Sequence, residues 1–242
     1  ILYRFPDISG IKTVPSVGRS ENMSEGRTVD STESTADDGH IHFIKTFKEV
    51  CRDPATRNLL ISISVVGLAT AGITYYNEPL CAFSGMGEGD VNTVLLIQPI
   101  ASLVINVLTG ILADKMGRRY VVQMGIALSL ISGVAFTLGV GRGVSAVLLG
   151  ILWGCMNGFY FSAEELINLL VMENVDISVR GRASAMSTLS YGIGDQLGIF
   201  AISLVVGCLG MRWAKLVFLV PPLVIAMVVL RRREIEKRRK HA

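Results

Sequence analysis

The chain has 242 residues, of which 50% are hydrophobic, and its formal net charge is +3. Its mean hydropathy of +0.50 is too high for an ordinary soluble domain. The charges gather at both ends and in short clusters between apolar runs, so the composition predicts a helical protein that crosses a membrane several times. Because the basic residues flank apolar runs, the small positive charge does not indicate nucleic-acid binding.

Both ends of the chain are polar. Residues 1–40 are rich in Ser, Thr, Gly and acidic residues, which predicts a disordered or extended arm. Residues 41–58 mix apolar and basic side chains at helical spacing, which predicts an amphipathic helix that lies in the membrane interface and stops before Pro54. Residues 231–242 form a strongly basic tail.

Between these ends lie six apolar runs, each about long enough to cross a bilayer. They predict an all-α membrane domain of six transmembrane helices over residues 59–230. The expected spans are 59–76, 91–113, 120–140, 145–172, 183–209 and 213–230. The acidic stretch NEPLCAFSGMGEGD after the first run is expected to be a loop. The Pro221–Pro222 pair is expected to kink the last helix or to delay its start.

The turn between the second and third runs is very short and highly charged. Two spans joined by so few residues lie antiparallel and side by side. Gly117 is expected to form the turn, Gly110 to let a neighbouring backbone approach, and Asp114 to pair with nearby arginines. The pattern G-x-x-x-D-K-x-G-R-R between two spans resembles the signature loop of the major facilitator superfamily of transporters. The matching residues are Gly110, Asp114, Lys115, Gly117, Arg118 and Arg119.

A second stretch, ENVDISVRG, is similar to the E-x-x-P-T-x-x-R-G pattern between the tenth and eleventh helices of sugar porters and organic-ion transporters. Glu173, Arg180 and Gly181 match, whereas Asp176 and Ile177 stand in place of Pro and Thr. The family has two six-helix halves, and this chain is long enough for one. The polar arm, the amphipathic segment and the basic tail resemble the central loop followed by the C-terminal half.

Basic residues between the runs are concentrated on one side of the expected membrane. That side holds both ends of the chain and the two matched stretches, whereas the other side holds Arg142, Arg212 and Lys215. The bias predicts an integral membrane protein with both termini on the cytosolic side or its organelle equivalent. There the two matched stretches are expected to form one charge network. It either latches this side during alternating access or only fixes the loop geometry.

Polar side chains inside the runs are costly in a membrane and therefore indicate function. Asp195 lies near the middle of the fifth run and Glu164 in the fourth, and we expect one of them to bind substrate or a coupling proton. The fourth run carries a polar stripe at helical spacing, formed by Asn157, Tyr160, Glu164 and Asn168. The expected polar contacts to substrate are Asn157, Tyr160 and Gln98. The alternative is that these groups hydrogen-bond between helices and hold the bundle together.

Glycines repeat every four residues in the fourth run, at Gly150, Gly154 and Gly158, and in the fifth run, at Gly194 and Gly198. Small residues at this spacing predict close helix packing. The four cysteines are expected to be unbridged packing residues. No motif or spacing indicates an enzyme, a cofactor or a metal site.

Two functions follow from the resemblance and the composition. The first is one half of a secondary transporter that moves a small polar or ionic organic solute, such as a sugar or an organic ion, with protons as a candidate coupling ion. It needs a lipid bilayer and a second six-helix bundle, which is a missing N-terminal half, a partner chain or a second copy. The alternative is a structural subunit of a larger membrane complex that transports nothing.

Overall fold

The computed structural model describes the backbone of residues 54–241 and, within that range, the side chains of residue 54 and residues 56–231. The predicted arm and most of the predicted amphipathic helix lie outside the described residues. The helices are α2 (Pro54–Thr70), η1 (Ala71–Tyr75), α3 (Asn77–Phe83), α4 (Glu88–Met116), α5 (Arg118–Gly139), α6 (Ala146–Glu173), η2 (Ile177–Val179), α7 (Arg180–Leu209) and α8 (Met211–His241). Within the described part of the chain, six helical stretches are long and apolar enough to cross a membrane. The predicted all-α membrane bundle is confirmed.

The stretch after the first span is more helical than the sequence predicts. Residues 77–83 form α3 and α4 already begins at Glu88, so the expected loop shrinks to residues 84–87. Leu80 and Cys81 are buried on one face of α3, and this packing favours a helix over a loop. Cys81 therefore lies in a buried helix and not, as expected, in a loop.

The first span is not a uniform α-helix. Its middle section, η1, is π-helical and links α2 to α3. Gly72 in η1 lies against the backbone of α8, where an added Cβ would stand 2.9 Å from both Leu219 N and Lys215 O. The absent side chain is what allows these two backbones to approach so closely.

The last span runs through both of its prolines. Pro221 and Pro222 lie inside α8, which begins at Met211, so the expectation of a delayed start is wrong. Helix α4 likewise contains Pro99. A helix that ended inside the bilayer would leave several backbone groups unpaired, which costs more than the hydrogen bonds that a proline removes.

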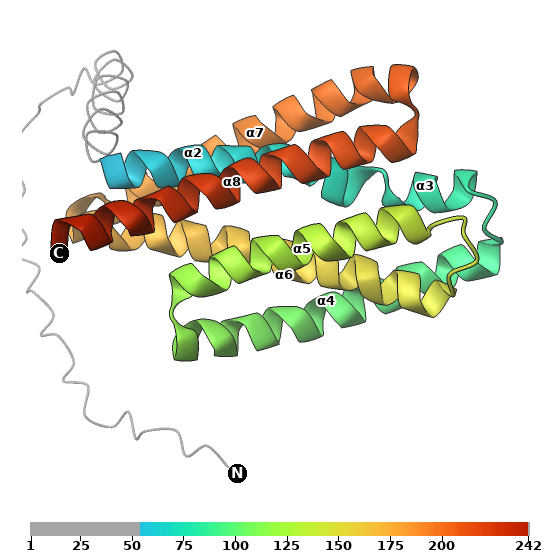
Figure 1. Cartoon of the computed structure of the whole chain (residues 1–242), viewed down its shortest axis with the longest axis horizontal. Helices are drawn as coiled ribbons and strands as arrows, with labels where there is room; N and C mark the ends of the chain where they lie inside the picture. The colour runs from blue at the N-terminus through green and yellow to red at the C-terminus, as the bar shows by residue number, and fades with distance from the viewer. Residues whose placement is uncertain (1–53, 242) are drawn as a thin grey trace, which may run out of the picture. The chain divides into compact units, whose positions relative to one another are not determined.

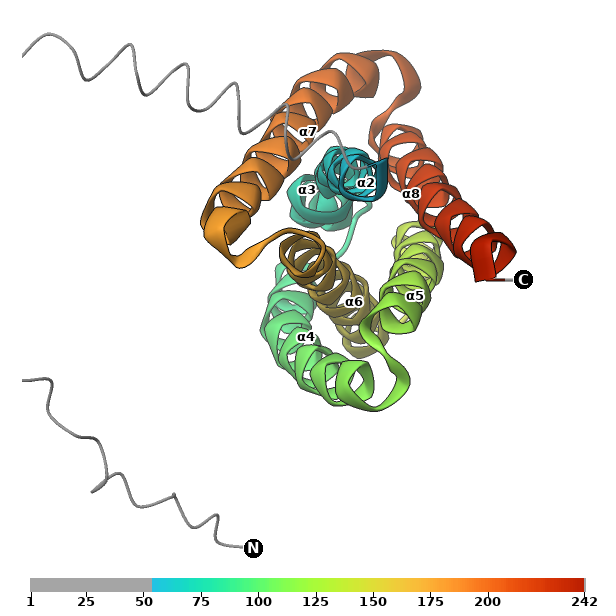
Figure 2. The ribbon, with the colours of Figure 1, turned by 90° about the vertical axis from the view of Figure 1, so that its left-hand side faces the viewer.

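The six spans form two groups of three helices, shown end-on in Figure 2. Helix α2 packs against α7 and α8, and α6 packs against α4 and α5. The groups meet where α5 contacts α8, where α6 contacts α7 and where α2 contacts α6. Helices α4 and α7 thus border one side of the bundle with α2 and α6 between them, while α5 and α8 lie on the opposite side (Figure 2).

Glycine seams hold each group together. On α6, Gly154 faces α4 so closely that an added Cβ would lie 2.6 Å from Gln98 O, and Gly150 and Gly158 also face this helix. On α7, Gly194 faces Ser64 of α2 in the same way. The predicted packing role of these glycines is therefore confirmed, because a side chain at any of them would push two helices apart.

Candidate functional site

The charged turn joins two spans at one end of the bundle, on the left in Figure 1. Gly117 links α4 to α5 with a φ of 90°, a conformation that favours glycine. Gly110 is not used for close approach as expected, since an added Cβ there would meet nothing within 4 Å. Gly181 at the start of α7 is equally open.

One ion pair joins the two sequence stretches that resemble family patterns. The Arg118 guanidinium contacts the Glu173 carboxylate, which ties the α4–α5 turn to the end of α6. The two side chains are 39% and 49% exposed, so water screens the pair. Across the side chains that the structure describes, Asp114, Lys115, Arg119 and Arg180 form no ion pair. The predicted network is thus reduced to one contact in this structure.

Inside the bundle, three hydroxyl groups connect three helices. Thr70 Oγ1 of α2 lies 2.5 Å from Tyr160 OH of α6 and 3.0 Å from Tyr191 OH of α7. Tyr160 OH also donates to Val66 O at 2.7 Å. Because each hydroxyl has one proton, Thr70 must donate to Tyr160, and Tyr191 must donate to Thr70. Tyr160 is 1% exposed and fully occupied by these bonds, which fits the alternative of a bond between helices. Its contact with substrate stays a prediction.

The two predicted carboxyl groups lie near the same tyrosine. Glu164 on α6 and Asp195 on α7 both interact electrostatically with the Tyr191 hydroxyl. Asp195 Oδ2 is 3.5 Å from Gln196 Nε2, while its Oδ1 is shielded from solvent and has no hydrogen-bond partner. The structure therefore brings together the acids that the sequence placed in two separate spans.

The other predicted polar contacts to substrate are Asn157 and Gln98. Asn157 on α6 is 7% exposed and its Oδ1 has no hydrogen-bond partner, as is also true of Asn168 Oδ1. Gln98 on α4 is half-buried, and its backbone carbonyl faces Gly154. Contact of Gln98 and Asn157 with a solute stays a prediction.

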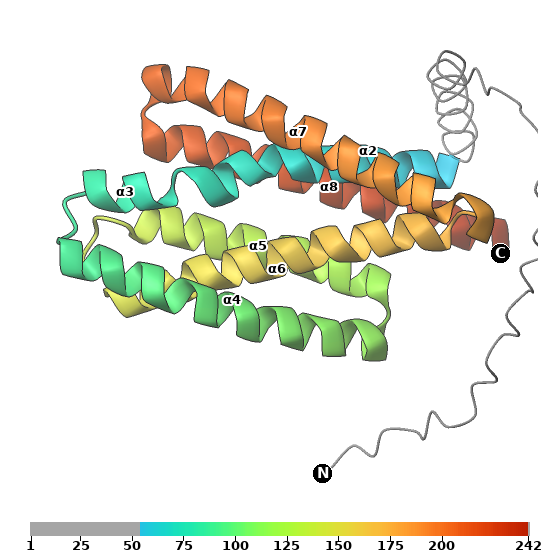
Figure 3. The same ribbon diagram turned by 180° about the vertical axis from the view of Figure 1, so that it is seen from behind.

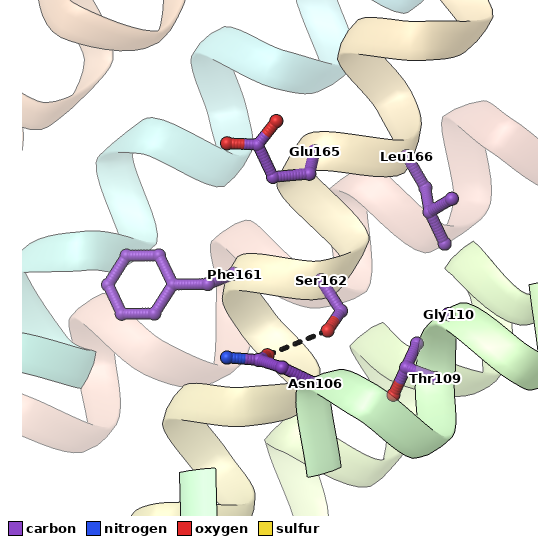
Figure 4. A pocket seen from close by; sticks show the side chains of 7 residues that line it. All are labelled: Asn106, Thr109, Gly110, Phe161, Ser162, Glu165 and Leu166. Atoms are coloured by element: carbon purple, nitrogen blue, oxygen red, sulfur yellow. Dashed lines mark hydrogen bonds between the residues drawn. The ribbon is translucent and has the colours of Figure 1, made fainter. Parts of the chain in front are cut away.

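A groove between α4 and α6 was not predicted. It has a volume of about 510 Å³ and is lined by Asn106, Thr109, Gly110, Phe161, Ser162, Glu165 and Leu166. Ser162 Oγ donates to Asn106 Oδ1 at 2.8 Å, so this bond links the two helices (Figure 4). A sequence signal was available, because polar residues lie three apart on each helix at Asn106 and Thr109 and at Ser162 and Glu165.

The sequence places Lys215 among the charges outside the membrane, but the structure buries this α8 side chain completely. Its Nζ lies 4.6 Å from the centre of the Phe136 ring and has no hydrogen-bond partner. Nearby, Arg212 Nη2 donates to Val140 O at 2.6 Å, just beyond the end of α5. Cations are favourable at a helix C-terminus, which is where Arg212 binds at the end of α5.

Comparison with known proteins agrees with this architecture. The model of the Major Facilitator Superfamily matches the chain over residues 15–194 and over residues 59–242. The arabinose-proton symporter of Bacillus subtilis (strain 168) is 21% identical over 179 residues, which cover 72% of this chain and 38% of the symporter. The chain thus spans well under half the length of this relative. With six helices in its described part able to cross a membrane, it is an integral membrane protein that belongs to the major facilitator superfamily.

Proposed function

We propose that the chain is the C-terminal six-helix half of a secondary transporter that moves a small polar or ionic organic solute by alternating access. The observation that carries the proposal is the set of carboxylates inside two spans, Glu164 and Glu165 on α6 and Asp195 on α7. Such groups are costly against lipid and occur where a helix faces a water-filled cavity or a partner helix. They fit a solute pathway on the side of the bundle between α4 and α7.

The exposed apolar faces of α4 and α7 support a partner on that side. Large apolar residues there recur at three- to four-residue spacing and are about half to two-thirds exposed. On α4 they include Leu96, Ile100, Leu103 and Val107, and on α7 they include Ile193, Leu197, Phe200 and Leu204. A second six-helix bundle seated on both helices would enclose the carboxylates that lie between them. It is a missing N-terminal half, a partner chain or a second copy.

The orientation belongs to the same proposal. The α4–α5 turn and the α6–α7 turn lie at one end of the bundle, together with the end of α8 (Figures 1 and 3). Their Lys and Arg residues favour the cytosolic side of a membrane or its organelle equivalent. An exposed pair such as Arg118–Glu173 is worth about 0.2–1 kcal/mol, so it would break readily as two halves rock. The alternative role of the pair is to fix the loop geometry.

Proton coupling is proposed through Asp195 or Glu164. The curated relative is named a proton symporter, and both carboxyl groups are partly buried and interact electrostatically with Tyr191. Replacing Asp195 by Asn keeps the shape of the side chain but removes its titration. Asp90→Asn is the matched control, because Asp90 is exposed in the first turn of α4.

The test has two steps. Extraction of the full chain in mild detergent, followed by native mass spectrometry, shows whether a second six-helix bundle is present. Uptake of labelled arabinose and of a labelled organic cation into proteoliposomes is then measured with and without a pH gradient. We expect Asp195→Asn, but not Asp90→Asn, to abolish the stimulation by the gradient. Recovery only within a large assembly that shows no uptake would overturn the proposal in favour of the structural subunit.

A further inference from the structure

The groove between α4 and α6 has the size of a site for a small molecule. Its volume of about 510 Å³ lies within the roughly 300–1,000 Å³ of typical ligand pockets. Figure 4 shows the Ser162–Asn106 bond at its centre, with Phe161 and Glu165 toward one side and Thr109 and Leu166 toward the other. The lining therefore combines polar groups with an aromatic and an aliphatic wall.

The hydroxyl groups of this lining have already used their protons. Ser162 donates its proton to Asn106 Oδ1 at 2.8 Å, and Thr109 donates its proton to Ile105 O at 2.7 Å. Both oxygens can therefore only accept a hydrogen bond from a ligand. The Glu165 carboxylate adds two further accepting oxygens, whereas the lining side chains offer one donor group, the amide nitrogen of Asn106. The groove is thus rich in acceptors and poor in donors.

The charge of the lining favours a cation. Glu165 is negative, and among the described residues that line the groove none is basic. Phe161 adds an aromatic ring, and such rings attract cations. Gly110 and Leu166 leave room for a short apolar group.

We infer that the groove between α4 and α6 binds a small primary ammonium ion that carries a short apolar chain. Its N–H groups would donate to Ser162 and Thr109, its chain would lie against Leu166, and the negative charge of Glu165 would attract it to the groove. A sugar-like ligand needs donors from the protein as well as acceptors, and an anion is repelled by Glu165. The inference rests on the proposed function in one respect, since it gives the chemical class of the solute.

Binding is measured without transport. Equilibrium dialysis of the purified full chain in mild detergent uses radiolabelled n-butylammonium as the probe, competed by tetramethylammonium, 1-butanol and butyrate. We expect saturable binding that tetramethylammonium displaces at least about tenfold more weakly than unlabelled n-butylammonium. Tetramethylammonium has the same charge but no N–H donors, and each hydrogen bond to a neutral acceptor is worth about 1 kcal/mol. Butyrate and 1-butanol should not compete.

Three substitutions locate the site. Glu165→Gln should weaken n-butylammonium binding by about tenfold, because it removes the negative charge that attracts the cation to the groove. Ser162→Ala and Thr109→Val should each weaken it by about threefold to tenfold. Glu88→Gln is the matched control, because Glu88 is exposed in the first turn of α4 and lies outside the groove, so binding should not change. Circular dichroism of each variant checks that the helices are retained.

The results separate this inference from the proposed function. Absence of saturable binding, equal displacement by tetramethylammonium, or wild-type affinity in Glu165→Gln would each overturn the ammonium site. Uptake of arabinose without n-butylammonium binding would refute the ammonium site and leave transport standing. Binding that follows the three substitutions, in a chain that takes up no solute, would support the site and refute transport.

Discussion

The α4–α6 seam allows one packing prediction to be worked out in detail. A Cβ at Gly154 would lie 2.6 Å from Gln98 O and 3.1 Å from Ser102 N, and it would also overlap the Ala101 side chain. In Gly154→Ala, helix α4 must therefore move back by roughly 1 Å, because the nearest atom, Ala101 Cβ, would lie even closer to the new side chain than Gln98 O does. The adjacent glycines Gly150 and Gly158 make the seam tight over two turns, so a local adjustment of one side chain cannot relieve the clash.

The expected loss follows from two opposing terms. A radial gap of about 0.5–1 Å forfeits a quarter to a half of each dispersion contact, and overpacking of this kind costs about 1–3 kcal/mol. Replacing Gly by Ala inside a helix gains about 1 kcal/mol in helix propensity. Gly192→Ala in α7 is the matched control, because an added Cβ there meets nothing within 4 Å. The difference between the two variants isolates the clash, at about 1–3 kcal/mol.

Thermal unfolding of the full chain in mild detergent measures this difference. We expect Gly154→Ala to melt below Gly192→Ala by roughly 2–4 °C for each kcal/mol of clash. Gly192→Ala should melt at or above the temperature of the unmodified chain. If Gly154→Ala melted as high as Gly192→Ala, α4 and α6 would not lie as close as the structure places them, and the account of the seam would be refuted.

Three further predictions concern polar groups. A double-mutant cycle with Arg118→Gln and Glu173→Gln should give a coupling energy of no more than about 1 kcal/mol, because the pair is exposed. A larger coupling energy would indicate a buried network. Lys215→Met should raise the melting temperature, because it removes a buried cation that has no hydrogen-bond partner. A lower melting temperature in this variant would show that Lys215 stabilises the bundle. Tyr160→Phe should lower the free energy of unfolding by about 1–3 kcal/mol, because Val66 O loses its side-chain donor. An unchanged denaturation midpoint would contradict the hydrogen bond from Tyr160 to Val66 O.

The positions of the spans could be predicted from the sequence because they depend on local properties. A run of about twenty apolar residues must form a helix in a bilayer, where backbone groups have no water to pair with. The turn at Gly117 was predictable for the same reason, since a charged break between two spans leaves few other conformations. The predictions failed for α3 and for the start of α8, where packing against other helices decides the structure.

The candidate site was only partly predictable. Asp195 and Glu164 were found because a carboxylate inside a span is costly wherever the helix lies. Helical spacing placed Tyr160 on one face of its helix with Glu164. Spacing gives the angle between side chains, but it does not give what that face contacts. The structure turns Tyr160 into the bundle toward Thr70, so its bonds are made within the protein.

The sequence by itself determined the family, the six spans and the identity of the acids inside them, because each depends on residues that are neighbours in the chain. Only the tertiary structure decided which polar groups meet. Asn106 and Ser162 form their bond across the α4–α6 groove, and Thr70 reaches Tyr191 across the α2–α7 seam. These partners are 56 and 121 residues apart in the chain. They come together because the glycine seams let whole helices approach, and that approach is a property of two surfaces and not of either helix alone.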